Sequence, residues 1–243
     1  MRFPRLARTP LSPLALAVCA GFAVLSTGCV NEAVLERRAN AARAAGDLDA
    51  EIGYMLESTQ RFPGSYESQL RLGTLYLEAD QPLRAETPLA LAHEIGIDWQ
   101  ARRVAAADLL AEAYGRQNAA DELARFVRDE SSQFGTVADY LREGRSMARI
   151  GDHDAAATAL EKAAYFADPT DPEPHLAQGQ FYESISDREA ATIAFRHAYT
   201  VAPNDPATAE ALRGVGLVPG PTLFLEPPRP AIAEVEPGAT TAP

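Results

Sequence analysis

Apolar residues recur at helical spacing through most of this chain, in short runs separated by polar breaks. The clearest example covers residues 172–205, where two amphipathic segments, about 172–184 and 188–200, flank the polar break Ser186-Asp187. Small and aromatic residues stand at fixed offsets within it: Gly179, Tyr182, Ala191, Phe195, Ala198 and Pro203. The pattern predicts two helices joined by a short turn.

The same pattern recurs upstream at a similar period. In residues 66–99, Gly73 and Ala85 are separated by the same step as Gly179 and Ala191. The other corresponding residues are Leu72, Tyr76, Leu89 and Ala92 in 66–99, Tyr140, Gly144, Met147, Ala156, Leu160 and Ala163 in 137–170, and Leu35, Ala39, Ala42, Met55 and Pro63 in 32–65. Residues 100–136 also hold two helical runs, but their Leu110-Ala111-x-x-Tyr114 fits only after a shift of a few residues. The pattern therefore gives four assignable repeats and one degenerate repeat.

These G-x2-Y, A-x3-F and P positions resemble the tetratricopeptide repeat, a helix–turn–helix unit of about 34 residues. The resemblance implies an all-α fold, a right-handed α-solenoid of about five repeats closed by a C-terminal capping helix. The repeats would cover 32–65, 66–99, 100–136, 137–171 and 172–205, with the capping helix at 206–214. Small residues would allow close helix approach and aromatic residues would fill the core, so we assign most aromatic residues to packing.

The N-terminal segment 1–28 has the character of a targeting signal. Three arginines precede an apolar run over 14–25, which is too short to span a membrane as a helix. The run ends in Leu-Ser-Thr-Gly-Cys at 25–29, which resembles a bacterial lipoprotein signal that is cleaved before a lipidated cysteine. Cys29 is the predicted lipidation site, and Cys19 fits less well. An ordinary signal peptide and an uncleaved membrane anchor are the alternatives.

Two residues, Val30 and Asn31, separate Cys29 from the first predicted helix, so the solenoid would begin close to the membrane. Neither residue is Asp, the usual signal for inner-membrane retention in this class of lipoproteins. The resemblance therefore implies a lipid-anchored protein of the cell envelope, at the periplasmic face of the outer membrane.

The charge balance limits the kinds of partner. The chain has 22 Lys and Arg residues against 34 Asp and Glu residues, and removing the signal would leave 19 against 34. Such a surface repels phosphate backbones and anionic headgroups, so we expect no nucleic-acid partner and membrane attachment through acyl chains alone. Cys19 would leave with the signal and Cys29 would carry lipid, so no disulfide is expected.

The sequence carries no recognisable catalytic or cofactor motif. The four histidines fall in different predicted helices or turns, and no pair has metal-ligand spacing: His93, His153, His175 and His197. Nucleophile, phosphate-loop and dinucleotide motifs are absent. We therefore predict no catalytic residues, no metal, no cofactor and no enzymatic activity. A cell-wall enzyme with an unrecognised site is the alternative from another class.

The C-terminal end, 218–243, changes in composition. Prolines are concentrated there, at Pro219, Pro221, Pro227, Pro228, Pro230, Pro237 and Pro243. This composition favours a disordered or extended tail. The short apolar patch Thr222–Leu225 interrupts it. That patch either folds back on the last helices or serves as a docking peptide for a partner.

Tetratricopeptide arrays bind peptides or protein segments on the concave face lined by the first helix of each repeat. Carried over by position, the groove candidates are Asn40, Arg43, Leu70, Arg71, Thr74, Leu77, Arg142, Arg145, Arg149, Leu176, Gln180 and Glu183. The spacing of Arg142, Arg145 and Arg149 puts them on one helix face, where they could clamp an acidic group of a partner. The alternative is charge balance against neighbours such as Asp139 and Glu143.

Together these features predict a membrane-anchored envelope lipoprotein that acts as a protein–protein interaction scaffold or adaptor. Some tetratricopeptide outer-membrane lipoproteins assist pilus or secretin assembly, and others scaffold cell-wall enzymes. The resemblance does not choose between these roles. A self-associating structural lipoprotein, a homo-oligomer whose groove holds a neighbour's tail, is a second possibility.

Overall fold

The computed structural model describes residues 31–227, and every regular element in this part of the chain is helical. This confirms the all-α prediction. The chain divides into two compact units, one up to Pro63 and one from Gly64 onward. Cys29, the predicted lipidation site, and the tail residues 228–243 lie outside the described residues.

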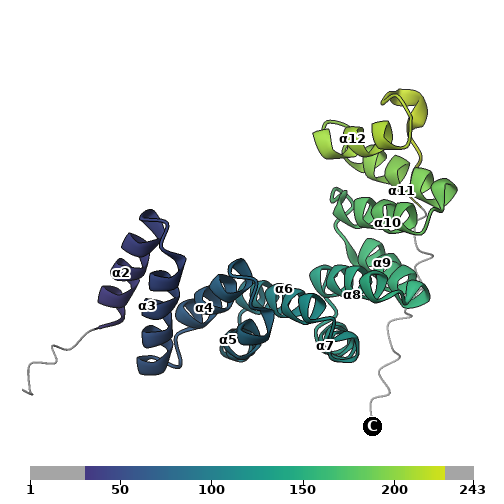
Figure 1. Cartoon of the computed structure of the whole chain (residues 1–243). Coiled ribbons are helices and arrows are strands. Elements are labelled where there is room, and N and C mark those ends of the chain that lie inside the picture. The colour runs from purple at the N-terminus through teal and green to yellow at the C-terminus, as the bar shows by residue number, and fades with distance from the viewer. Residues whose placement is uncertain (1–30, 228–243) are drawn as a thin grey trace, which may run out of the picture. The chain divides into compact units, whose positions relative to one another are not determined.

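The described part of the first unit is a single helix pair, α2 (Glu32–Ala44) and α3 (Leu48–Arg61) (Figure 1). The side chains of Asn31 and Asp47 cap the two helix starts by accepting hydrogen bonds from the backbone N–H groups of Val34 and Ala50. Ala39 and Met55 are buried in this pair.

The second unit continues the pattern of paired helices. Its helices are α4 (Tyr66–Glu78), α5 (Pro82–Ile95), α6 (Gln100–Gln117), α7 (Ala120–Gln133), α8 (Val137–Ile150), α9 (His153–Phe166), α10 (Glu173–Ser184), α11 (Arg188–Val201), α12 (Pro206–Gly214) and the 3-10 helix η2 (Pro221–Leu223). Consecutive helices from α4 to α12 pack against each other, and α4, α6, α8 and α10 also contact one another in turn. This arrangement confirms the solenoid fold class.

Three helix pairs of the second unit share one contact. Gly73, Gly144 and Gly179 lie on first helices, and each faces a large side chain of the second helix at the same separation in sequence: Leu89, Leu160 and Phe195, respectively. A Cβ atom at these glycines would lie 2.4, 2.6 and 2.1 Å from those side chains. Any larger residue would therefore force the paired helices apart, which is why the repeat pattern needs glycine here.

The pair α6/α7 departs from this pattern. Helix α6 has 18 residues, whereas α8 has 14. The equivalent buried positions are Ala111 and Val127, which keep the same separation in sequence as each glycine and its partner. Relative to the start of the helix pair, Ala111 stands about one turn later than Gly144. This extra helical turn is the reason that the register of residues 100–136 is unclear from the sequence.

The C-terminal patch folds back on the last helix pair. The Nε of Arg196 donates to the carbonyl of Leu223 at 3.0 Å, and the backbone N–H of Leu225 donates to Thr200 Oγ1 at 2.7 Å. Tyr199 packs on Phe224 with ring centroids 5.6 Å apart. The prediction of a disordered tail is therefore wrong for these residues. Of the two alternatives for the apolar patch, folding back on the last helices is the one that the structure has.

Candidate functional site

The first helices of successive pairs in the second unit form one continuous surface, which we call the first-helix surface (α4, α6, α8 and α10). Polar bonds join its helices. Arg116 of α6 donates to the carbonyl of Leu77 of α4 at 2.9 Å, and Arg142 of α8 donates to Asp108 of α6 at 2.7 Å. The spacing of these helices is therefore fixed by hydrogen bonds as well as by apolar packing.

Arg142 is not an exposed groove residue, so that prediction is wrong. Only 5% of its surface is exposed, and its guanidinium bonds to Asp108 and, at 3.0 Å, to Asp139. Arg142 instead balances the charge of neighbouring carboxylates, which was the alternative interpretation. Within the described residues the Nη2 of Arg142 makes no hydrogen bond, but it is buried and therefore out of reach of a partner on the surface.

Arg145 and Arg149 are exposed on α8, as the helical spacing predicted. Arg145 forms an ion pair with Glu173 at the start of α10. The guanidinium of Arg149 lies against Gly115 of α6, and within residues 31–227 it makes no hydrogen bond or ion pair. Of the three arginines proposed as a clamp, Arg142 and Arg145 are thus paired with carboxylates, and Arg149 is unpaired within residues 31–227.

The remaining candidates in the second unit differ in exposure. Leu77 and Leu176 are buried, with 4% and 7% of their surfaces exposed, so they are core residues and the groove assignment is wrong for them. Four others reach the surface in part or fully: Leu70 and Arg71 are half-buried, and Gln180 and Glu183 are exposed. Thr74 is half-buried and donates its hydroxyl to the carbonyl of Leu70 at 2.9 Å, which removes its donor from the surface.

Asn40 and Arg43 belong to the first unit, on α2, and both are exposed. Arg43 pairs with the buried carboxylate of Glu51 on α3 at 3.2 Å. Arg43 therefore has a structural partner within its own helix pair.

Between α6, α7 and α8 lies a feature that the sequence analysis missed, which we call the buried charge cluster: Arg103, Glu130, Asp139 and Arg142. Arg103 Nη1 donates to Glu130 at 2.5 Å and to Asp139 at 2.8 Å, and its Nη2 donates to Asp139 at 3.0 Å. The guanidinium of Arg103 also lies 3.8 Å from the ring centre of Phe134. His93 of α5 approaches the cluster, with Nε2 3.1 Å from Glu130 Oε1.

The cluster keeps its carboxylates ionised. Burial alone would raise the pKa of Asp139, but hydrogen bonds from Arg103, Thr136 and Arg142 bring that pKa below its ordinary value. Burial would likewise raise the pKa of Glu130, and the nearby His93 and Arg103 lower it. The opposite balance applies to Arg103, where burial would lower the pKa and the two carboxylates raise it. At neutral pH the cluster therefore consists of charged, mutually compensating groups.

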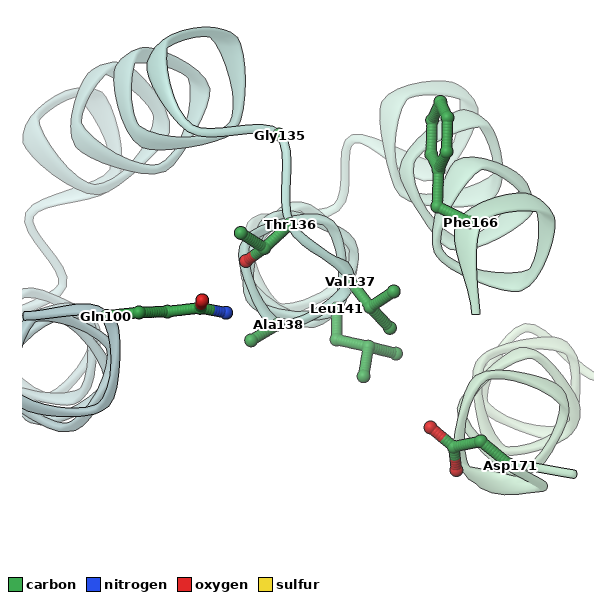
Figure 2. Close-up of a pocket in the computed structure, with 8 residues that line it drawn as sticks. All are labelled: Gln100, Gly135, Thr136, Val137, Ala138, Leu141, Phe166 and Asp171. Carbon is green, nitrogen blue, oxygen red and sulfur yellow. The ribbon is translucent and has the colours of Figure 1, made fainter. Parts of the chain in front are cut away.

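A pocket of about 550 Å³ opens beside this cluster, where α6 and α8 begin (Figure 2). It is lined by Gln100, Gly135, Thr136, Val137, Ala138, Leu141, Phe166 and Asp171. In Figure 2, Val137 and Leu141 lie between the amide of Gln100 on one side and the carboxylate of Asp171 on the other. The pocket thus combines an apolar floor with polar groups at its margins, the usual composition of a binding site.

The charge cluster supports the pocket directly. Thr136, a lining residue, caps α8 in a capping box: its backbone N–H and its hydroxyl both donate to Asp139, at 3.1 and 2.6 Å. Because Asp139 also accepts hydrogen bonds from Arg103 and Arg142, the start of α8 is held in place by the buried charge cluster. The pocket is consequently built on a rigid element.

Aromatic side chains extend the pocket at its α9 side. Tyr140 of α8 stacks on Phe166 with ring centroids 5.6 Å apart and planes at 14°. Phe166 and its neighbour Tyr165 are both about half exposed. The side chain of Lys162 lies 5.6 Å from the ring centre of Tyr140. Exposed aromatic rings next to an apolar pocket are characteristic of protein-binding surfaces.

The histidines do not assemble a metal site in residues 31–227, where no group of three or more His, Cys, Asp or Glu side chains could hold an ion. His175 of α10 and His197 of α11 lie in separate helices, as predicted, and their rings are in contact, with centroids 5.5 Å apart. Burial lowers the pKa of His175, and burial together with nearby His175 and Arg196 lowers the pKa of His197 to about 4. Among the described helices none has the length and hydropathy needed to cross a bilayer.

No protein-family model and no curated protein matches this chain. Solved structures do match in fold. A tetratricopeptide repeat protein from Parabacteroides merdae is 19% identical, with a TM-score of 0.51, over 83% of this chain and 77% of that one. The MamA protein is 19% identical with a TM-score of 0.53, over 78% and 98% of the two chains. PilW, described as a widely conserved type IV pilus biogenesis factor, is 13% identical with a TM-score of 0.53, over 82% and 90%.

These similarities show that the chain has a tetratricopeptide-like fold.

The buried charge cluster had one signal in the sequence. Glu130 stands at the position that Ala92, Ala163 and Ala198 occupy in the other pairs, at the same offset from the start of the second helix. A charged residue at a position reserved for packing indicates a buried ionic partner.

Proposed function

We propose that this protein is an interaction scaffold that binds a segment of another protein at the pocket and along the adjoining first-helix surface. The observation that carries the proposal is the pocket itself, a depression about 550 Å³ in volume with apolar and polar lining residues at the start of adjacent first helices. Tetratricopeptide-like folds present such surfaces for other chains.

The dimensions and chemistry of the pocket suit one or two side chains of a bound segment. Val137 and Leu141 would contact an apolar anchor, and the Gln100 amide and Asp171 carboxylate would receive polar groups beside it. The half-exposed rings of Tyr165 and Phe166 would cover the anchor from the α9 side. Because the buried charge cluster holds the start of α8 in place, little ordering would be needed on binding.

A pair of matched substitutions tests this proposal. Val137→Glu puts a carboxylate on the apolar floor, at a helix start where acidic residues are tolerated. Leu83→Glu makes the same chemical change in the first turn of α5, at a residue that is 72% exposed and outside the pocket. Cross-linking in the native envelope followed by mass spectrometry should lose a specific partner with Val137→Glu and keep it with Leu83→Glu. Equal capture by both variants would count against the pocket.

We further propose that the scaffold is anchored in the cell envelope through a lipid on Cys29. This rests on the sequence of residues 1–29 alone. A Cys29→Ser variant should lose incorporation of a palmitate analogue and should be recovered in the wash of isolated membranes. A variant that stays bound to membranes without incorporating lipid would contradict the anchor but would not affect the proposed binding surface.

A further inference from the structure

The C-terminal segment is held along α11 in a definite direction. The carbonyl of Leu223 accepts from Arg196, and the N–H of Leu225, two residues on, donates to Thr200, one turn further along the helix. The described chain therefore runs toward the C-terminal end of α11 when it reaches Pro227.

That end of α11 is close to the pocket. His197, next to the anchoring Arg196, contacts His175 in the first turn of α10 at 5.5 Å between ring centroids. Asp171, four residues before His175, lines the pocket, as does Phe166 at the C-terminal end of α9. Between the segment held on α11 and the pocket, these contacts therefore pass through one element, the start of α10.

The remaining sequence is long enough to cross that distance. Residues 228–243 follow Pro227 and contain three further prolines after Pro228. An extended proline-rich chain advances about 3.1 Å per residue, so Ile232 reaches roughly 15 Å from Pro227 and Val235 roughly 25 Å. Packed helices lie about 8–10 Å apart, so a span of two helices is about 20 Å and falls between these values.

The same residues match the pocket in chemistry. Ile232 and Val235 offer aliphatic anchors for the floor formed by Val137 and Leu141. Arg229 precedes them, and Asp171 is the charged residue in the lining. Prolines in a segment limit the conformations that it can adopt, which lowers the entropy lost on docking.

We propose that residues 228–243 of this chain occupy the pocket of the same molecule, so that an external partner binds by displacing them. The inference rests on the proposed function, because it takes the pocket to be the binding site. It assigns the pocket an occupant that competes with the partner and sets the affinity with which the partner binds.

The first test compares the full chain with a chain that ends at Pro227, both extracted in the same detergent. A labelled peptide of residues 228–243 is titrated into each, and binding is followed by fluorescence anisotropy. The truncated chain should bind the peptide at least about tenfold more tightly than the full chain, because the full chain carries a competing copy at high effective concentration. In the truncated chain, Val137→Glu should abolish binding and Leu83→Glu should leave it unchanged.

Equal affinity for the full and truncated chains, or no binding to either, would overturn the inference. The proposed function is tested separately with an array of unrelated peptides on the truncated chain. Peptides that bind there and are lost with Val137→Glu would leave the proposed function standing even when the tail peptide does not bind. Absence of any Val137-sensitive peptide would remove both.

The second test separates docking within a molecule from docking between molecules. A photoreactive benzoylphenylalanine replaces Ile232 in the full chain, which is mixed with an isotopically heavy copy before irradiation. Cross-links to Val137, Leu141 or Phe166 within light chains alone support the inference. Cross-links between light and heavy chains, or none to the pocket, overturn it.

Discussion

The helix pairs α6/α7 and α10/α11 solve the same packing problem in different ways. In α10/α11, Gly179 lets the ring of Phe195 pack against the first helix, and the contact is apolar. In α6/α7, the alanine of the other pairs is replaced by Glu130, which is buried with Arg103. The glycine contact joins only two helices, whereas the charged one joins α6, α7 and α8 and reaches His93 of α5.

The difference shows where rigidity is concentrated. A glycine contact holds one pair together and leaves its neighbours to apolar stacking. The buried charge cluster fixes three successive helices and the start of α8, which is where the pocket lies. The comparison predicts that removing charge from the cluster will affect stability more than enlarging any single glycine.

Asp139→Ala should have the largest effect. Asp139 is fully buried and accepts hydrogen bonds from Arg103, Arg142 and Thr136, so its loss removes one of the two carboxylates that each buried arginine contacts. We expect a loss of about 3–5 kcal/mol in the free energy of unfolding, measured by urea denaturation. The control Glu173→Ala, which removes only the exposed pair with Arg145, should cost less than about 1 kcal/mol. Similar losses in both variants would mean that the buried charge cluster contributes no more to stability than an exposed ion pair.

Gly179→Ala should come next. The added Cβ would lie 2.1 Å from the buried ring of Phe195, which has no space to move. We expect a loss of about 2–3 kcal/mol by the same measurement. Combining it with Phe195→Val, which reproduces the Ala111 and Val127 pair of α6/α7, should recover part of the loss, and failure to recover any would show that the strain lies elsewhere.

Acidification should weaken α10/α11 before it weakens the cluster. The folded-state pKa of His197 is about 4, below the ordinary histidine value of 6.5, so the unfolded chain binds a proton more readily. Stability from this group is complete above about pH 6.5 and is lost as the pH falls toward 4. After allowance for solvent screening, we expect about 1–2 kcal/mol. Amide exchange, corrected for intrinsic rates, should show lost protection in α11 at pH 5.

The same experiment on the cluster should give the opposite result. Asp139 and Glu130 have lowered pKa values, so their contribution persists at pH 5 and is lost only below about pH 4. A His197→Gln variant should reduce the pH dependence of α11 protection, and adding His175→Gln should remove the rest, because burial lowers the pKa of His175 as well. Equal loss of protection in α8 and α11 at pH 5 would contradict this comparison.

Gly115→Ala should have the smallest effect, although its added Cβ would also lie 2.1 Å from a neighbouring atom. That atom is Nη1 of Arg149, the end of a flexible and exposed side chain, which can move aside. Since alanine favours the helix, the net change should stay within about 0.5 kcal/mol of zero. A loss as large as that of Gly179→Ala would show that Arg149 is held rigidly against α6.

The repeat pattern was readable because its determinants are local and periodic. Gly73, Gly144 and Gly179 stand at a fixed distance before their partners, and the same spacing appears in the structure. Arg103 lies 27 residues before Glu130 and 36 before Asp139, and no periodic signal joins them. Helical spacing placed Arg142 on the correct face of α8, but it could not show that α6 covers that position.

Repeat proteins are commonly treated as strings of interchangeable modules that can be deleted, duplicated or grafted one at a time. The buried charge cluster removes that freedom here. Excising α6 and α7 would leave Asp139 and Arg142 in α8 without Arg103, Glu130 and Asp108. A deletion or insertion of repeats should therefore be tolerated better outside α5–α8 than within it, because only a cut within this block separates the charged groups from their partners.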